Sequence, residues 1–319
     1  YTYKAYAIDA AGNLNVSSQR SVTYENTAPF FTWEDETPGD GATIDSASAL
    51  LNVSVSDADG DQTSALFDWN NSLLGYWSFD YYNSTHVYDN SSYDRHTAFV
   101  GGFDDTNITT GYYGTALSFD GDNDWLEPGE IINSTSYTKA AWIYSRDTSS
   151  GNIISGDVAA GTDSHAFWVT SSYNAAWCKD STATSYTVRS GHNNNWCEVV
   201  STTEPALNSW LHVVVTYDAA TTTKKLYING TLEDTNTSSA AITDATAQIG
   251  TFSDANNFWD GMMDEVLILN RALSEQEVLA LYNNTANQLY NNFTGLAEGQ
   301  TYTYKAYAID AAGNLNVSS

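Results

Sequence analysis

SWLHVVVTYDAATTTKKLYINGTLED, residues Ser209 to Asp234, contains two apolar segments separated by a turn-forming stretch. WLHVVVTYD is rich in β-branched and aromatic residues, and KKLYING follows it after a threonine-rich turn. Segments of this length and composition, bounded by polar turns, are typical of β-strands. The stretch therefore predicts two adjacent strands and an all-β region around them.

One short helix is expected near the end of this region. Ser274 and Glu277 have the spacing of a capping box, in which each residue satisfies a backbone N–H of the other. An apolar face follows at Val278, Leu281 and Tyr282. The pattern predicts a helix over residues 274–282.

Further segments match the motif order of one known family. In sequence order they are GYWSFD (75–80), YGTALSFDGDNDWLEP (113–128), AAWIYS (140–145), the strand pair quoted above and GMMDEVLILNRALSEQEVLALYNN (261–284). This series resembles the laminin-G-like jelly rolls of the concanavalin-like lectin and glucanase superfold. The resemblance implies a jelly-roll sandwich over residues 74–284.

The first 18 residues, YTYKAYAIDAAGNLNVSS, return letter for letter as residues 302–319. Such identity does not arise by chance, and the spacing is far longer than the roughly 20–50 residues of solenoid repeats. We interpret the chain as one period of a covalent tandem array. An engineered overlap is the alternative.

The repeated segment alternates aromatic and polar residues, which predicts a half-buried strand, and then turns at AAGN. With NVSSQRSVTY after the turn, residues 1–24 predict a strand, a turn and a strand. They resemble the closing strands of an immunoglobulin-like or fibronectin-like sandwich. Because an isolated strand pair is marginally stable in water, we expect residues 1–24 to pack on strands of a preceding domain.

Strands are also predicted on both sides of the jelly roll, and neither group completes a sandwich alone. They are Phe30–Trp33, Ala49–Ser56 and Ser64–Trp69 before it, and Leu289–Thr294 and Thr301–Ile309 after it. We therefore expect one immunoglobulin-like domain split into residues 25–73 and 285–319. The predicted fold class is all-β, with a laminin-G-like jelly-roll sandwich inserted into this split immunoglobulin-like β-sandwich and one short helix.

The net charge of -28 comes from 39 acidic and 11 basic residues, which argues against nucleic acid and anionic membranes as partners. No window approaches 18 consecutive apolar residues, so no membrane insertion is expected, and no signal peptide is visible. The abundance of Tyr, Trp, Ser, Thr and Asn is typical of extracellular β-proteins.

No catalytic pattern is evident. Glucanases of the superfold carry a Glu-x-Asp-x-x-Glu row, because glycoside hydrolysis needs two carboxylates about 5–10 Å apart. This row is absent, the five histidines are scattered, and Asp264-Glu265 is interpreted as a structural motif. We predict that the chain is not an enzyme.

The resemblance implies one possible cofactor, a structural calcium ion, with Asp89 and Asp264 as its ligands. The segment after Asp89, NSSYDR, departs from the Gly-rich turn of the family. DADGD (57–61) and DGDND (120–124) are further acidic turns, the second of which is interpreted as a hairpin turn of the family. Solvated acidic turns without a metal are the alternative.

Cys178 and Cys197 each follow a tryptophan and bracket a polar stretch. Two flanking strands with facing cysteines would form a disulfide, which for a loop near 20 residues contributes roughly 3 kcal/mol. Such a bond indicates an extracellular or cell-surface location. Two unrelated buried thiols are the alternative.

The sequence contains many Asn-x-Ser/Thr sequons, which mark N-glycosylation in a suitable compartment, although composition alone is the alternative explanation. Together with the disulfide and the repeat, they favour a glycosylated surface protein that resembles archaeal surface proteins. The sequons begin at Asn15, Asn52, Asn70, Asn83, Asn90, Asn107, Asn133, Asn229, Asn236, Asn283, Asn292 and Asn316.

Two functions agree with these features. The first is a structural repeat unit of an N-glycosylated extracellular fibre, stalk or sheath, whose partners are copies of itself. The alternative is a glycan-binding, lectin-like adhesin, with avidity from the array. Its ligand-binding residues are not assigned, although Trp168, Trp177 and Trp196 are the tryptophans considered for ligand contact.

Overall fold

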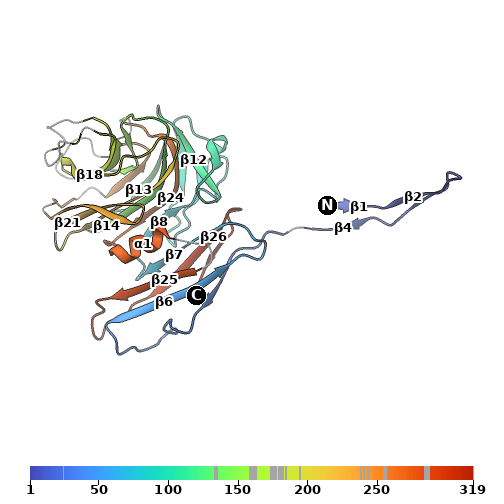
Figure 1. Ribbon diagram of the computed structural model, residues 1–319, viewed down its shortest axis with the longest axis horizontal. Helices are drawn as coiled ribbons and strands as arrows, with labels where there is room; N and C mark the ends of the chain where they lie inside the picture. The colour runs from blue at the N-terminus through green and yellow to red at the C-terminus, as the bar shows by residue number, and fades with distance from the viewer. Residues whose placement is uncertain are drawn as a thin grey trace.

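The structure is a computed structural model. It describes residues 1–23, 25–132, 136–157, 164–172, 178, 183, 185–193, 195–237, 239, 241–242, 245–253, 257–283 and 288–318. Most of these residues form two β-sandwiches that pack against each other, and a separate hairpin lies at the N-terminus (Figure 1). No helix in these ranges is long and apolar enough to cross a membrane.

The larger sandwich has one eight-stranded antiparallel sheet, which we call the large sheet. Strand β8 (Leu73–Trp77) pairs with one half of β24, and β12 pairs with the other half. The remaining order across the sheet is β11 (Ile108–Thr110), β12 (Thr115–Asp120), β24 (Asp260–Leu269), β14 (Tyr137–Ser145), β20 (Trp210–Asp218), β21 (Thr223–Ile228) and β22 (Thr231–Asn236).

The facing layer is made of two shorter sheets. One has the order β16 (Ile154–Ser155), β23 (Thr246–Ile249), β13 (Trp125–Glu130), β10 (Thr97–Val100) and β9 (His86–Val87). The other has the order β15 (Gly151–Asn152), β17 (His165–Thr170), β18 (Thr187–His192) and β19 (Asn195–Val200). The chain passes from one sheet to the other between the consecutive strands β15 and β16. A 3-10 turn, η1 (Asp105–Asn107), precedes β11.

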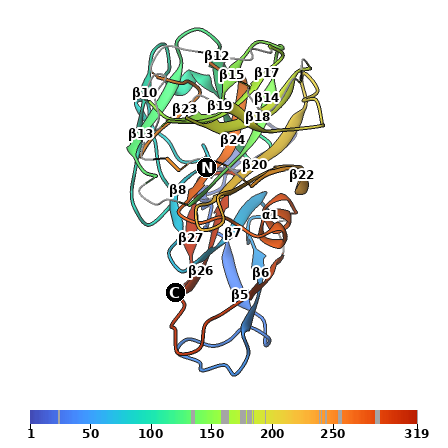
Figure 2. The ribbon, with the colours of Figure 1, turned by 90° about the vertical axis from the view of Figure 1, so that its left-hand side faces the viewer.

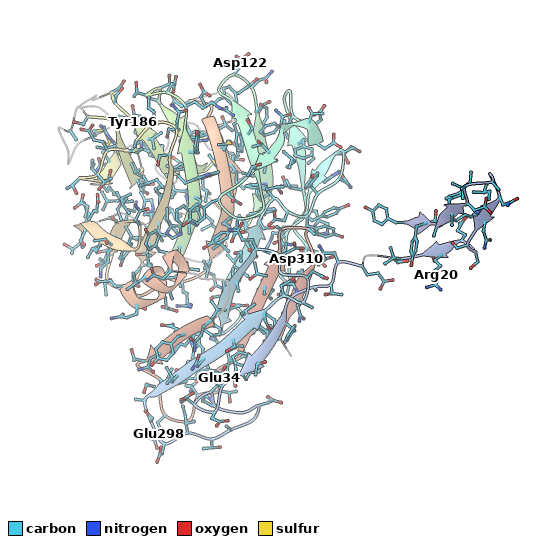
Figure 3. The ribbon with its side chains drawn as sticks, turned by 45° about the vertical axis from the view of Figure 1, so that its right-hand side comes forward. Arg20, Glu34, Asp122, Tyr186, Glu298 and Asp310 are labelled. Carbon is cyan, nitrogen blue, oxygen red and sulfur yellow. A yellow bond between two sulfur atoms is a disulfide. The ribbon has the colours of Figure 1, made fainter. Side chains whose placement is uncertain are left out.

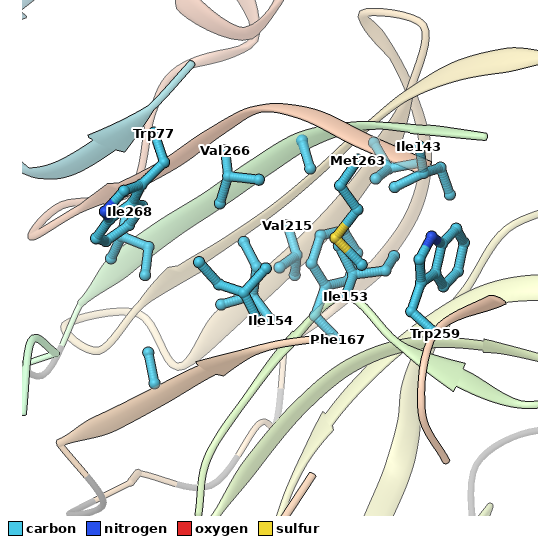
Figure 4. Packing of buried hydrophobic residues seen from close by; sticks show 14 of the residues in the cluster. Trp77, Ile143, Ile153, Ile154, Phe167, Val215, Trp259, Met263, Val266 and Ile268 are labelled. Atoms are coloured by element: carbon cyan, nitrogen blue, oxygen red, sulfur yellow. The ribbon is translucent and has the colours of Figure 1, made fainter. Parts of the chain in front are cut away.

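The core of this sandwich lies between the layers. Phe167 of the facing layer packs with Val215 and Met263 of the large sheet (Figure 4). Trp77 and Trp259, fully enclosed, lie on opposite sides of this group in Figure 4. This arrangement confirms the all-β jelly-roll class, and the strand pair in Ser209–Asp234 forms β20 and β21 as predicted.

The predicted helix is also confirmed. It forms α1 (Glu275–Tyr282), with Ser274 as its N-cap and both capping-box hydrogen bonds to Glu277 present. Val278 is buried in a cluster with residues of both sandwiches, so the helix helps to fill the junction between them.

The second, smaller sandwich contains strands from both sides of the jelly roll. One sheet has the order β25 (Gln288–Thr294), β6 (Ser48–Ser56), β5 (Phe30–Trp33), and the other β27 (Leu315–Val317), β26 (Tyr304–Asp310), β7 (Thr63–Trp69). We call these six strands the small sandwich, which Figure 2 shows below the jelly roll. Its immunoglobulin-like identity and the domain boundaries remain predictions.

Strand β26 is buried on both faces, which differs from the half-buried strand expected from its alternation. Ala306 and Ala308 face the partner sheet of the small sandwich. Tyr307 and Ile309 face the outer side of the large sheet, in the cluster of Val214 and its neighbours. The second face is covered because the jelly roll packs on it.

Residues 1–23 form a hairpin that extends away from both sandwiches (Figures 1 and 3). Strand β1 (Thr2–Tyr3) pairs with β4 (Arg20–Ser21), and β2 (Tyr6–Ile8) pairs with β3 (Leu14–Val16). All residues of these four strands are exposed. Packing of this segment on strands of another domain remains a prediction.

Candidate functional site

The outer face of the large sheet carries a row of half-exposed side chains across four adjacent strands. Tyr144 lies opposite Trp210 on one neighbouring strand and opposite Met262 on the other, and Met262 lies opposite Ser118. The rings of Tyr144 and Trp210 meet edge to face, with centroids 5.4 Å apart. Because residues of a row point to the same side of a sheet, the four side chains form one continuous surface.

A second layer of rings supports this row. Tyr112 is 36% exposed and stacks on the buried Trp142, with centroids 3.4 Å apart and ring planes 14° apart. Tyr112 also approaches Trp210 edge to face at 6.4 Å. Tyr112, Trp142, Tyr144, Met262 and Trp210 together make the surface that we call the aromatic face.

Polar groups border the aromatic face at one end. Arg146 directly follows the end of β14, and its side chain reaches Ser118 of the row. Its guanidinium donates to the side chain of Ser118 and to the carbonyl of Phe119, 2.6 Å away, and pairs with Asp260 at 3.3 Å. Aromatic rings beside fixed donors and acceptors suit a ligand that has both apolar faces and polar edges.

The loop that carries Tyr112 is fixed by the carboxylate of Asp264. Oxygen Oδ2 of Asp264 accepts hydrogen bonds from the backbone N–H groups of Tyr112 and Tyr113, at 2.7 and 2.9 Å. Gly111 is required at this approach, because a Cβ there would lie 2.6 Å from the same oxygen. The aromatic face therefore depends on a buried carboxylate beneath it.

Glu265 points to the same side of the sheet as Asp264, although they are neighbours in the chain. The register of β24 against β14 shifts here, because Trp142 pairs with Asp264 but Ala140 pairs with Leu267. Three steps along β24 thus correspond to two steps along β14. Glu265 has a φ of 52°, in the left-handed region. This bulge turns the Glu265 carboxylate outward, where it accepts from the side chains of Ser64 and Tyr76.

Burial controls the charge of this acid pair. Burial raises the pKa of Glu265 to about 8, although hydrogen bonds from Ser64 and Tyr76 act in the opposite direction. Burial and the neighbouring Glu265 raise the pKa of Asp264 well above its usual range. Burial also raises the pKa of the nearby Asp80 to about 7. Protons are therefore retained at this junction near neutral pH.

The acid pair has little space for a substrate. A cavity of about 10 Å³ lies beside Glu265, Trp142 and His212, which is enough for one water molecule. Ser64 belongs to the small sandwich and Tyr76 to the jelly roll, so the Glu265 carboxylate links the two sandwiches. This geometry supports a structural role for Asp264-Glu265; the absence of enzymatic activity stays a prediction.

Asp89 has the hydrogen-bond pattern of a residue that fixes a turn. Its two oxygens accept from the backbone N–H groups of Tyr76, Ser91 and Arg95 and from the hydroxyl of Ser91, at 2.7 to 2.9 Å. Four donors occupy the directions in which a cation would lie. Within the described ranges, no group of three acidic, His or Cys side chains could hold a metal ion. The donor set of Asp89 does not fit calcium.

The other two acidic turns are likewise occupied by protein donors. Oxygen Oδ1 of Asp57 accepts from the backbone N–H groups of Asp59 and Asp61. Asp120 does the same for Asp122 and Asn123. These are turns closed by an aspartate side chain, which agrees with the hairpin-turn interpretation of residues 120–124.

The predicted disulfide between Cys178 and Cys197 is confirmed, with Cα atoms 4.7 Å apart. Cys197 is in β19, whereas Cys178 itself is not in a strand, and its neighbours 173–177 and 179–182 lie outside the described residues. The bond ties Cys178 to β19. Buried Arg189 supports it by donating to Sγ of Cys178 at 3.4 Å and to the Ser172 carbonyl at 3.1 Å.

The tryptophans considered for ligand contact are not exposed. Trp168 and Trp196 are 7% and 8% exposed and pack around the disulfide, and the indole N–H of Trp168 donates to the Trp196 carbonyl. Trp177 lies outside the described residues. Their sequence motif gives no measure of burial, whereas Trp210, which is not one of these three, is half-exposed. Its position as the first residue of β20, directly after the polar Asn208 and Ser209, is the available signal.

The sequon asparagines differ in accessibility. Asn52 and Asn90 are buried, so these two predicted glycosylation sites are not accessible in this fold. Asn133 lies outside the described residues. The exposed asparagines are Asn15, Asn70, Asn83, Asn283 and Asn292, and the half-buried ones are Asn107, Asn229, Asn236 and Asn316.

The chain belongs to the concanavalin A-like lectin/glucanases superfamily. The family model matches residues 119–279, just over half of the chain. These residues include four of the five members of the aromatic face, all except Tyr112, and the acid pair beneath it. A comparison with curated proteins found no match to this sequence.

Two solved structures are similar to this one at low sequence identity. Domain 4 of an extracellular GH43 arabinanase from Geobacillus stearothermophilus, in complex with arabinotriose, is 17% identical, with a TM-score of 0.51, over 69% of this chain and 99% of that domain. A sialidase from Trypanosoma rangeli is 16% identical, with a TM-score of 0.46, over 66% of this chain and 32% of the sialidase. At these identities the likeness concerns the fold alone.

Proposed function

We propose that the chain is a carbohydrate-binding module and that its aromatic face binds neutral oligosaccharides. The main support for this proposal is the row of Tyr144, Trp210 and Met262 on the large sheet, which Tyr112 extends. Apolar faces of sugar rings stack on such rings, while Arg146 and Ser118 provide hydrogen-bonding groups at the edge.

The charge of the protein favours a neutral ligand. A net charge of -28 repels acidic saccharides, and Arg146, the cation beside the aromatic face, is already paired with Asp260. Membership of a lectin and glucanase superfamily supports a saccharide over other neutral ligands. The arabinotriose bound to the arabinanase domain makes that sugar a useful first probe.

Titration of arabinotriose and a panel of neutral oligosaccharides against the full chain, followed by calorimetry, tests this proposal. Trp210→Ala removes one ring of the row, and binding is expected to weaken at least about tenfold, about 1.4 kcal/mol. Tyr290→Ala is the matched control, because Tyr290 is exposed on β25, away from the aromatic face.

Two results would refute this site. One is an oligosaccharide that binds the parent chain and Trp210→Ala equally well. The other is a panel without any binder at millimolar concentration, in spite of an intact fold by circular dichroism.

We infer a second role as a structural repeat unit of an N-glycosylated extracellular or cell-surface array. The supporting observation is that the sequence-identical residues 1–18 and 302–319 form hairpins with the same register, offset by 301 residues. Electron microscopy of the native protein tests this role. Filaments with one repeat per axial step are expected, whereas uniform single particles would contradict it.

A further inference from the structure

The N-terminal hairpin has an apolar surface without a partner. Tyr6 and Ile8 are 67% and 71% exposed, whereas their sequence-identical counterparts Tyr307 and Ile309 are 1% and 0% exposed. Figure 3 shows the side chains of the hairpin, around Arg20, in open surroundings. The same sequence is therefore covered by other parts of the protein in the C-terminal copy and uncovered in the N-terminal copy.

The C-terminal copy identifies what that binding surface is. Strand β26 pairs with β7 over its whole length, with Ala308 opposite Ala65 and Tyr307 opposite Leu66. Its other face packs Tyr307 and Ile309 onto the large sheet of the jelly roll. Pairing with β7 alone would bury only part of the hairpin. The complete binding surface therefore consists of a small sandwich together with a jelly roll.

The hairpin cannot reach this position in its own chain while β4 stays paired. Val22 hydrogen-bonds Tyr1, the counterpart of Tyr302, whereas Asn26 is held near the other end of β26 by Asp61 and Asn314. Tyr302 and the other end of β26 are eight extended residues apart along the strand, a distance of about 26 Å. The four residues from Val22 to Asn26 span at most about 14 Å. The acceptor must belong to another copy.

We propose that residues 1–23 dock on residues 25–301 of a second copy of this repeat, along its β7 and against its large sheet. In this position Tyr1 and Tyr3 replace Tyr302 and Tyr304, which contact Trp69 and Trp33 in the present structure. The contact is head to tail, so repeated docking produces an open chain of copies. This proposal deepens the array role and is independent of the carbohydrate site.

The identity of the two copies allows a matched test in the full chain. Ala308→Asp places an unpaired charge between the sheets of the small sandwich and disfavours β26 in its own position. The intact N-terminal hairpin of another molecule then takes its place. Mass photometry and light scattering should show a weight-average mass that rises at least about twofold with increasing concentration.

Two controls use the same substitution. Ala7→Asp, at the counterpart position, should stay monomeric because its own β26 is intact. The double variant Ala7→Asp with Ala308→Asp should stay monomeric with a disrupted small sandwich. If Ala308→Asp stays monomeric at all concentrations, or if it and the double variant associate equally, the proposal is overturned.

A cysteine pair tests the register even if Ala308→Asp folds poorly. Ala7→Cys with Ala65→Cys, in the Ala308→Asp background, should form a disulfide between molecules, because Ala308 lies opposite Ala65. Ile8→Cys with Ala65→Cys should not, since these side chains point to opposite faces. Equal cross-linking of both pairs contradicts the register. Oligosaccharide binding is measured separately, so failure of docking does not affect the first proposal.

Discussion

Residues 1–18 and residues 302–319 have one sequence in two environments. Both form a hairpin closed by an aspartate, in which Oδ1 of Asp9 accepts from Ala11 and Asn13, and Oδ1 of Asp310 accepts from Ala312 and Asn314, at 2.8 to 2.9 Å. The strand registers are also the same. Local sequence therefore encodes the hairpin, whereas burial depends on what lies beside it.

The environments differ in the free energy that the side chains contribute. Burial of a large apolar side chain contributes about 1.5–3 kcal/mol relative to exposure. Tyr307 and Ile309 receive this contribution from the jelly roll and β7, whereas Tyr6 and Ile8 receive little of it. Substitutions at paired positions should therefore have unequal effects.

The largest difference is expected for Tyr307→Ala against Tyr6→Ala. The first substitution empties a fully buried site and should lower the free energy of unfolding by about 3 kcal/mol or more. The second should change it by less than about 0.5 kcal/mol. Denaturation at submicromolar concentration, followed by tryptophan fluorescence, measures both. Equal losses would mean that the N-terminal copy is packed within its own chain.

Per pH unit, a smaller effect is expected from titration at the junction that buries β26. Glu265 has a raised pKa, so between pH about 4.5 and about 8 the folded protein keeps a proton that the unfolded chain has lost. Stability should be highest at the acid end and fall by up to about 1.4 kcal/mol per pH unit from this group.

Glu265→Gln isolates this contribution, because the amide does not titrate. The slope of stability against pH should become less negative in this variant. Hydrogen exchange, corrected for the pH dependence of the intrinsic exchange rates, should show that β26 loses protection as the pH rises in the parent chain. No corresponding change is expected in β2. An unchanged slope in Glu265→Gln would show that this carboxyl is not the titrating group.

A further comparison concerns the aspartate turns. Asp310→Ala removes acceptors for two backbone N–H groups and for the Asn314 amide, and should destabilise the small sandwich by about 1–2 kcal/mol. Asp9→Ala should open the same turn without a measurable change in global stability. NMR shifts of each turn and chemical denaturation report the two effects. A global loss in Asp9→Ala would contradict this comparison.

The smallest effect is expected at the duplicated sequon. Asn15 is exposed, whereas Nδ2 of Asn316 donates to the Pro29 carbonyl at 2.7 Å. After expression in an N-glycosylating host, occupancy at Asn15 should exceed that at Asn316. Tryptic glycopeptides distinguish the two, because the first ends in SSQR and the second in SS. Higher occupancy at Asn316 would indicate that the N-terminal hairpin is covered.

Much of the fold could be predicted because its signals are local. The capping box placed α1, strand composition placed β20 and β21, and the small-sandwich strands lie within a few residues of their predicted bounds. The disulfide followed from two cysteines and their spacing. Each of these features depends on residues that are close in the chain.

The candidate site could not be predicted in the same way. The aromatic face joins residues of separate strands, and the outward turn of Glu265 requires the bulge against β14. The resemblance implies Asp89 as a calcium ligand, whereas its donors, Tyr76 among them, come from other segments and are visible only in the structure. Trp168 and Trp196 are candidates for ligand contact in the sequence alone, because burial around the disulfide is not a local property.

The sequence by itself determined the strands, the helix cap, the hairpin turn and the resemblance to a jelly roll, because backbone preferences and short-range hydrogen bonds act within a few residues. Only the tertiary structure decided which faces are buried, which acids retain protons and which rings remain accessible. These properties depend on surfaces brought together from distant parts of the chain. The two identical hairpins, one buried and one exposed, separate these contributions within a single molecule.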